Sequence, residues 1–450
     1  MIKKEKLYDN IVFFLLYWCT LQEVLLAVIY KLTSNRVLTN LLFYSKDFFM
    51  VTLFLCALLK KNSKKLFCPV LFYIFFLVIS FIISLTGLHQ KSAGNMTSLF
   101  QNLRNFLVFP CFVIIGANIN DKAKFTDRLI DRFFPFIVVC AFLGIAEYCL
   151  DFIVGTKEFW TSTIGYTNFY VTIKKQEGNM LYGLPANFYG SYGGDYFSVK
   201  RLVGPWANPL TSAYNMAIPT IYYYITFVDT LGKRKINKTD LKNLLRFMIM
   251  LTAIYFTHTR LILLTLVLLC AYYLLVYSKK KILLFMAAAV ACVVLLAMTD
   301  WQRLMSFLFD GSTAAHILSV TNSIKNIRYT LLGNGLSYIG IYGVAGATES
   351  TYLTILGNLG IVGLAVFIYT YGLYSKRALK MFKKGNSFSL VVFLASVMFA
   401  ISGLVSEQLF AYTTIAEFYI LLGMNSRSNL SQKVSSYKTT GCSSKVETCA

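Results

Sequence analysis

The sequence predicts an all-α integral membrane protein with about twelve transmembrane helices. Hydrophobic residues make up 57% of the 450 residues and charged residues only 14%, whereas a soluble domain carries roughly a quarter charged residues. The mean hydropathy is +0.60. Apolar runs of about 20 residues recur along the chain, which is the length that a helix needs to cross a bilayer. The alternating ten-residue segments of a transmembrane β-barrel do not occur, so the spans are predicted to be helical.

The distribution of lysine and arginine predicts how these helices are oriented. The formal net charge is +23, but the basic residues gather in short connections after every second span, as the positive-inside rule requires. The charge therefore reflects membrane topology, and we expect no nucleic-acid partner. With twelve spans, both termini and every lysine-dense connection face the cytoplasm.

The predicted spans follow one another in chain order, with the two longest connections on the outer side. Residues 1–425 form the membrane domain, with outer loops 155–207 and 299–350. Residues 426–450 are rich in Ser, Lys and Thr without periodicity, which predicts a disordered cytoplasmic tail. The spans cover about 11–30, 38–59, 66–86, 105–118, 134–154, 209–228, 244–257, 261–277, 282–298, 351–374, 388–405 and 409–424.

Cysteine usage and the lack of internal symmetry argue against several classes of protein. None of the ten cysteines falls in a predicted outer segment, and their spacing matches no metal site, so we expect neither a disulfide framework nor a metal. The two halves of the chain show no repeat. Many secondary transporters are built from such repeats, so their absence weakens a transporter interpretation.

Two arginines lie on the predicted outer side, where the orientation of the helices by the positive-inside rule does not explain them. Arg201 begins a run that contains Gly204 and Asn208 just before a span, and Arg260 opens another span with His258 beside it. A guanidinium group binds phosphate through its planar fork of donors, and an arginine at a span is costly unless it meets an anion or water. The alternative for both is an interfacial anchor that contacts lipid headgroups.

Two residues of the second outer loop are candidates for proton transfer. His316 is the best-placed imidazole, although it can also be a surface histidine. Glu349 lies just before a span, where a carboxylate acts as a base or is merely favoured by the helix dipole. Gly333 and Gly335 permit close approach of the backbone to a ligand, but this spacing usually marks only a turn.

Other charged residues lie in or near the spans. Arg328 ends a predicted surface helix over 317–329, and Arg104 lies near the outer end of a span, where it can add to an anion site. Ionisable groups within membrane segments are functional candidates by default. The remaining ones are Glu23, Lys46, Asp47, Glu147 and Glu417.

Four motifs in order resemble the Wzy-type O-antigen and capsular polysaccharide polymerases, within the wider O-antigen ligase/polymerase superfamily. The resemblance covers roughly residues 200–365, and elsewhere rests on hydropathy alone. The motifs are Arg201-x-x-Gly204-x-x-x-Asn208-Pro209, Thr257-His258-Thr259-Arg260, Ser312 and His316 followed by Gly333-x-Gly335, and Glu349-Ser350-x-Tyr352-Leu353 leading into Gly357-x-x-Gly360.

The resemblance implies a fold similar to the integral-membrane GT-C glycosyltransferases and a location in the bacterial plasma (inner) membrane. It implies transfer of a glycan from a polyprenyl diphosphate, such as undecaprenyl diphosphate, to a lipid-linked acceptor at the outer face, lengthening a surface polysaccharide. Arg201 and Arg260, supported by Arg328 or Arg104, would hold the diphosphate, and Glu349 or His316 would deprotonate the acceptor. No cofactor, metal or nucleotide sugar is implied. A flippase and a chain-length regulator are the expected protein partners.

Two other functions remain as alternatives. An O-antigen ligase would transfer the finished glycan to a terminal acceptor, but members of that branch typically have a histidine where Glu349 stands. A flippase or other transporter of lipid-linked oligosaccharide would also have about twelve spans, yet it predicts short outer loops and charges deep in the bundle.

Overall fold

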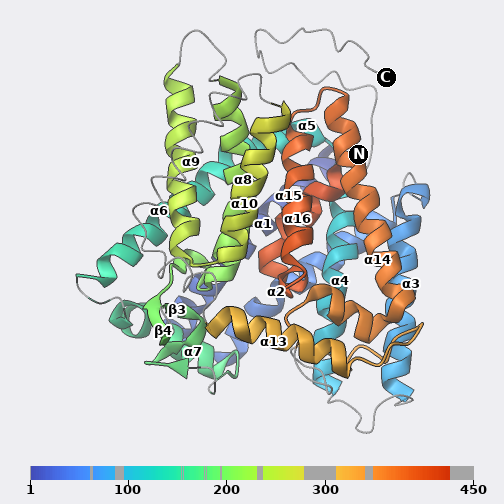
Figure 1. Cartoon of the computed structure of the whole chain (residues 1–450), viewed down its shortest axis with the longest axis horizontal. Coiled ribbons are helices and arrows are strands. Elements are labelled where there is room, and N and C mark those ends of the chain that lie inside the picture. The colour runs from blue at the N-terminus through green and yellow to red at the C-terminus, as the bar shows by residue number, and fades with distance from the viewer. Residues whose placement is uncertain are drawn as a thin grey trace.

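Long helices run side by side between two ends of the molecule, and a small region with two β-hairpins covers one of those ends (Figure 1). This computed structural model describes residues 2–60, 64–86, 96–153, 155, 157–176, 178, 180–192, 195–230, 237–277, 311–339 and 348–425. The predicted span at 282–298 and the predicted tail at 426–450 lie outside these residues.

The helices of the bundle take up most of the described chain. They are α1 (Ile2–Thr33), α2 (Arg36–Leu58), α3 (Lys64–Thr86), α4 (Met96–Ala117), α5 (Lys122–Arg128), η1 (Leu129–Phe133), α6 (Phe134–Asp151), α8 (Pro209–Thr230), α9 (Lys238–Phe256), α10 (Arg260–Tyr277), α14 (Thr351–Lys383), α15 (Phe388–Ser402) and α16 (Tyr412–Met424).

Shorter elements lie outside the bundle. They are η2 (Phe159–Thr163), α7 (Tyr166–Thr172), β1 (Met180–Leu181), β2 (Leu184–Pro185), η4 (Ala186–Phe188), β3 (Tyr189–Tyr192), β4 (Asp195–Lys200), η5 (Gly204–Trp206), α13 (Gly311–Asn326) and η6 (Gln408–Phe410). The strands form two antiparallel hairpins, β1–β2 and β3–β4.

The prediction of a multi-pass helical membrane protein is confirmed, but the count of about twelve spans is not. Among the described residues, six helical segments are long and apolar enough to cross a membrane, and two shorter helices, Arg260–Val276 and Phe388–Ser402, are strongly apolar. The prediction counted every apolar run. Helix α16 has only 13 residues, while α8 and α9 carry many hydroxyl, amide or charged side chains. Helix α16 is therefore too short for a span, and α8 and α9 are too polar.

Two predicted boundaries were wrong for local reasons. Residues 119–133 were expected to be a connection because of their charges, yet α5, η1 and α6 join into one apolar stretch, Lys122–Asp151, of 30 residues. Asp121 caps its start by accepting a hydrogen bond from the backbone of Lys124. Helix α4 begins at Met96, before the predicted start at 105, because its first turns are polar but still helical.

Helices α4 and α16 form the centre of the buried core. They approach closely because glycine removes the side chain where their backbones meet. A Cβ atom added to Gly116 would lie 2.0 Å from the carbonyl oxygen of Ile420, and one added to Gly423 would lie 2.1 Å from that of Val113. The phenylalanine and tyrosine rings around this contact are almost fully buried.

One end of the bundle, which we call the basic end, holds the N-terminus of α1 and the end of α16 (Figure 1). The Asp9 carboxylate accepts hydrogen bonds from the backbone of Asn120 and Asp121. The Lys60 ammonium donates to the carbonyl of Asn118 at 3.2 Å, and Lys122 donates to that of Met424. Lysines therefore bind the exposed carbonyls at helix C-termini, as the helix dipole favours.

The opposite end, which we call the hairpin end, holds α7, both hairpins and α13 (Figure 1). Helix α13 lies across this end instead of along the bundle (Figure 1). The turn from α9 to α10 and the start of α14 also lie here. Segments from both predicted outer loops are therefore neighbours at one end of the molecule.

We expect Gly116→Ala to destabilise the protein by about 1–3 kcal/mol, because the added methyl group meets backbone that cannot move independently. The thermal unfolding midpoint in detergent should fall by several degrees. Gly372→Ala is the matched control, since no atom lies within 4 Å of the added Cβ and alanine favours the helix. Equal midpoints for the two variants would contradict the close α4–α16 contact.

Candidate anion-binding site

The β3–β4 hairpin carries Arg201 to the turn between α9 and α10. The backbone amide of Arg201 donates to the carbonyl of Phe188 at 2.7 Å, and the amide of Leu202 donates to that of Phe256 at 2.8 Å. The guanidinium Nε donates to the carbonyl of Thr257 at 2.7 Å, and a terminal nitrogen donates to the Thr259 hydroxyl at 3.2 Å. These bonds fix the orientation of the Arg201 side chain.

The turn itself has an unusual backbone. His258 has a φ of 51°, in the left-handed region that residues other than glycine rarely adopt. The Thr257 hydroxyl donates to the carbonyl of Ile254 at 2.6 Å and lies 3.1 Å from the Thr259 hydroxyl. Among the described residues, Nε2 of His258 is buried without a hydrogen-bond partner. Strain and an unpaired polar atom together are typical of a functional site.

Arg201 and His258 both lie in the electrostatic field of Arg260, and His258 also lies in that of Arg201. Burial, and then the charge of Arg260, lowers the pKa of Arg201 to about 10. Burial, and then the charges of Arg201 and Arg260, lowers the pKa of His258 to about 4. His258 is therefore neutral at physiological pH. Two partly desolvated positive charges beside a neutral imidazole form a site that favours an anion.

Gly204 and Asn208 shape the chain between Arg201 and α8. Gly204 has a φ of 52°, and its neighbours include the ring of Trp206 and the backbone of Gly144. The Asn208 side-chain oxygen accepts hydrogen bonds from the backbone of Leu210 at 2.9 Å and Thr211 at 3.2 Å. Asn208 thus caps the first turn of α8, so both residues support the position of Arg201 through the backbone.

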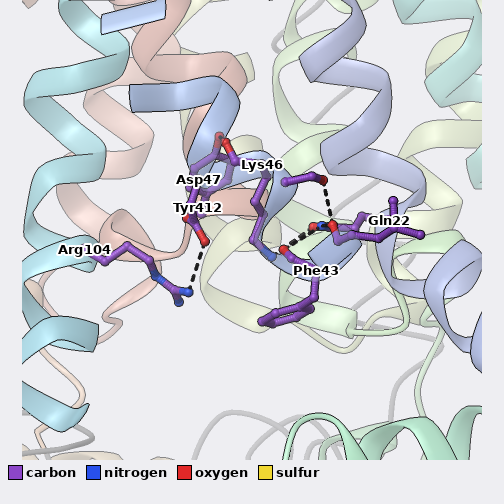
Figure 2. A network of polar contacts seen from close by, with 8 residues as sticks. Gln22, Phe43, Lys46, Asp47, Arg104 and Tyr412 are labelled. Carbon is purple, nitrogen blue, oxygen red and sulfur yellow. Dashed lines mark hydrogen bonds and ion pairs between the residues drawn. The ribbon is translucent and has the colours of Figure 1, made fainter. Parts of the chain in front are cut away.

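Arg104 belongs to a different polar network, between α1, α2 and α4 (Figure 2). Its guanidinium lies 3.5 Å from the Asp47 carboxylate. The neighbouring Lys46 is buried and donates to the Gln22 side chain at 2.9 Å, and the Tyr412 hydroxyl donates to the carbonyl of Lys46 at 2.6 Å. The structure therefore pairs Arg104 with an acid of α2 rather than with Arg201.

The glycine-rich turn of the second predicted outer loop packs against a break in α14. Gly360 has a φ of 76° and interrupts this helix. The amides of Asn334 and Gly335 donate to the carbonyls of Gly357 and Asn358 at 3.1 and 3.2 Å. A Cβ atom on Gly333 would lie 2.1 Å from the carbonyl oxygen of Asn358. Gly333 and Gly335 therefore allow close helix packing.

The remaining predicted site residues lie at the hairpin end. Glu349 is half-buried before α14, and the Tyr352 hydroxyl donates to the carbonyl of Ala400 at 2.8 Å. Arg328 is exposed after α13. His316 lies in α13, but its side chain is outside the described residues.

Several contacts of this region were missed by sequence reasoning. Thr257 and Thr259 orient Arg201, and an aromatic group around Tyr148 and Tyr182 lies beside Lys200. The sequence did offer one signal for this arrangement. Side chains alternate between the two faces of a strand, so the adjacent Lys200 and Arg201 must face opposite sides. Lys200 forms ion pairs with Glu147 and Asp151, which the sequence left unpaired.

No protein-family model matches this sequence, and no curated protein sequence matches it. The site is therefore interpreted from its own geometry and from its motifs.

We expect the protein to lose stability on acidification partly through His258. Its folded pKa of about 4 lies below the ordinary value of 6.5, so the unfolded chain binds the proton more readily and stability falls between about pH 6.5 and pH 4. His258→Asn does not titrate there and tolerates a left-handed backbone. The thermal midpoint of the variant should therefore fall less than that of the natural protein between pH 7 and pH 4.5. Identical pH profiles would contradict the proposed burial of a neutral imidazole.

Proposed function

We propose that this protein is a polysaccharide polymerase of the Wzy type, which transfers a glycan from a polyprenyl diphosphate to a lipid-linked acceptor. The single observation that carries the proposal is that the Arg201 guanidinium donates to Thr257 and Thr259, which brings it to the turn that Arg260 follows at the hairpin end. Arg201 and Arg260 are 59 positions apart in the sequence, and both belong to motifs that resemble this family.

The reaction needs neutralisation of a leaving group. The acceptor hydroxyl attacks the anomeric carbon, the bond from that carbon to the diphosphate oxygen breaks, and negative charge develops on the departing diphosphate. Arg201, held by Thr257 and Thr259, and Arg260 would bind this charge without reorganising during the step. Neutral His258 would add no charge, and its unpaired Nε2 is available to bind the substrate.

The proton of the acceptor hydroxyl requires a base. Glu349 and His316 are the candidates, since both lie in segments at the hairpin end. In this proposal the hairpin end faces the outer side of a bacterial plasma membrane, and the basic end, with the start of α1 and the end of α16, faces the cytoplasm. A GT-C-like arrangement of the bundle would let the polyprenyl chain remain in the lipid. A flippase would supply the donor, and a chain-length regulator would limit growth.

We expect Arg201→Ala and Arg260→Ala to reduce chain growth by about 10²–10³-fold each, which is the usual effect of removing one charge-stabilising donor. Lipid-linked glycan from cells that lack the gene and carry each variant would be resolved by size on a gel. A single-repeat-unit lipid should accumulate. Arg36→Ala is the control, because Arg36 is an exposed arginine at the start of α2, outside the site.

The same gel distinguishes the alternatives. Normal-length polysaccharide in both arginine variants would refute the diphosphate site. Repeat units trapped on the cytoplasmic face in cells without the gene would indicate a flippase. Long lipid-linked chains that never reach a final acceptor would indicate a ligase.

Two substitutions should show which of the two candidates is the base. Glu349→Gln keeps the shape of the side chain but cannot accept the proton, and His316→Ala removes the imidazole. The rate of chain growth should fall by about 10²–10⁴-fold in the variant that lacks the base. The exposed Glu158→Gln serves as control. Full activity in both test variants would remove this loop from the mechanism.

A further inference from the structure

A cavity lies beside the arginine pair, at the outer end of α6. Its volume is about 440 Å³, within the range of about 300–1,000 Å³ typical of small-molecule sites. Aromatic rings dominate its wall, and two charged groups face it. The lining residues are Tyr148, Asp151, Phe152, Tyr182, Tyr189, Val199 and Lys200.

The aromatic wall combines a rigid ring with exposed ones. Tyr148 is buried and stacks on Phe256, with ring centroids 4.5 Å apart. Phe152 is 77% exposed, and Tyr182 is 64% exposed. The Tyr182 ring meets Tyr189 edge to face at 5.5 Å. Large exposed rings around a cavity provide flat apolar surfaces for a ligand.

Tyr182 is held in place against its backbone preference. The β1–β2 turn has two central residues, Tyr182 with φ 51° and Gly183 with φ 82°. Turns with two positive φ values favour Asn-Gly, so a tyrosine at the first position is unusual. The Thr167 hydroxyl fixes the turn by donating to the carbonyl of Gly183 at 2.8 Å. Such a constrained residue points to a function for its side chain.

The charged groups of the cavity are also held in place. The Lys200 ammonium forms an ion pair with Glu147 and lies 3.4 Å from the Asp151 carboxylate. The Trp160 indole donates to the same Glu147 carboxylate at 2.8 Å. An ammonium donor and a carboxylate acceptor next to aromatic surfaces match a molecule that has both hydroxyl groups and apolar faces.

We propose that this cavity binds one or two sugar residues of the substrate glycan, with Tyr182 and Tyr189 stacking on sugar rings, Tyr148 forming part of the apolar wall, and Asp151 and Lys200 binding hydroxyl groups. The inference rests on the proposed function for the identity of the glycan. Lys200 and Arg201 are consecutive at the end of β4, and the Tyr148 ring stacks on Phe256, two residues before His258. The cavity therefore adjoins the proposed diphosphate site across the end of β4.

Photochemical capture in living cells tests the inference directly. The photoreactive residue p-benzoylphenylalanine would be placed at position 182 or 152 of the full-length protein in its own host. After irradiation, the protein would be purified under denaturing conditions, and sugars released from it by acid would be quantified. Position 369 is the control, because Tyr369 is 65% exposed and follows the start of α14 at the hairpin end by 18 residues. We expect at least about tenfold more sugar from positions 182 and 152. Equal amounts from all three positions would mean that these rings only contact the membrane, and would overturn the inference.

A second experiment is independent of capture. Tyr182→Asn removes the ring but suits a left-handed turn residue, so the protein should fold and unfold at an unchanged temperature. Its initial rate of chain growth should fall about three- to tenfold, whereas Tyr182→Phe should retain nearly the full rate. A wild-type rate in Tyr182→Asn would refute the stacking role.

The two proposals fail in different ways. Sugar captured at position 182 together with normal chain growth in Arg201→Ala and Arg260→Ala would leave a glycan-binding cavity but refute the diphosphate mechanism. Loss of chain growth in the arginine variants, with no more sugar at position 182 than at position 369, would refute the cavity alone.

Discussion

The attachment of β4 to the turn between α9 and α10 is the contact on which the hairpin end depends. The Arg201 guanidinium provides it by donating to Thr257 and Thr259, and the backbone amide of Leu202 adds a bond to the carbonyl of Phe256. A hydrogen bond to a charged donor is stronger than a neutral one, especially when water is partly excluded. This contact places the hairpins beside the bundle and leaves the positive charge of Arg201 next to that of Arg260.

Like charges brought together are unfavourable, and burial increases the effect. The depressed pKa of both Arg201 and His258 reflects that burial and the neighbouring charges. An anion bound between the arginines would relieve the repulsion, so the site gains more from a diphosphate than two separate surface arginines would. The adjacent cavity adds apolar stacking surfaces without adding positive charge to the site, because the Lys200 ammonium is paired with two carboxylates, Glu147 and Asp151.

Several features of the fold could be predicted because they depend on local sequence. Apolar runs predicted α1, α2 and α3 to within a few residues or turns, since a bilayer-spanning helix needs a continuous apolar stretch. The continuation of α5 into α6 could not be predicted, because charged side chains can extend from the end of a helix into water without breaking the helix. The break of α14 at Gly360 could not be predicted either, since an isolated glycine in an apolar run is compatible with both a straight and an interrupted helix.

The sequence by itself determined the class of this protein, the order of its helices and the two arginines worth testing. Those conclusions follow from composition, from hydrophobic length and from the cost of placing a charge near lipid. Only the tertiary structure decided which charges are neighbours. It paired Arg104 with Asp47, turned Gly333 toward α14, and brought Tyr148 and Tyr182 to one cavity. These contacts join residues far apart in the chain, and they depend on how whole helices and hairpins pack, which no local pattern specifies.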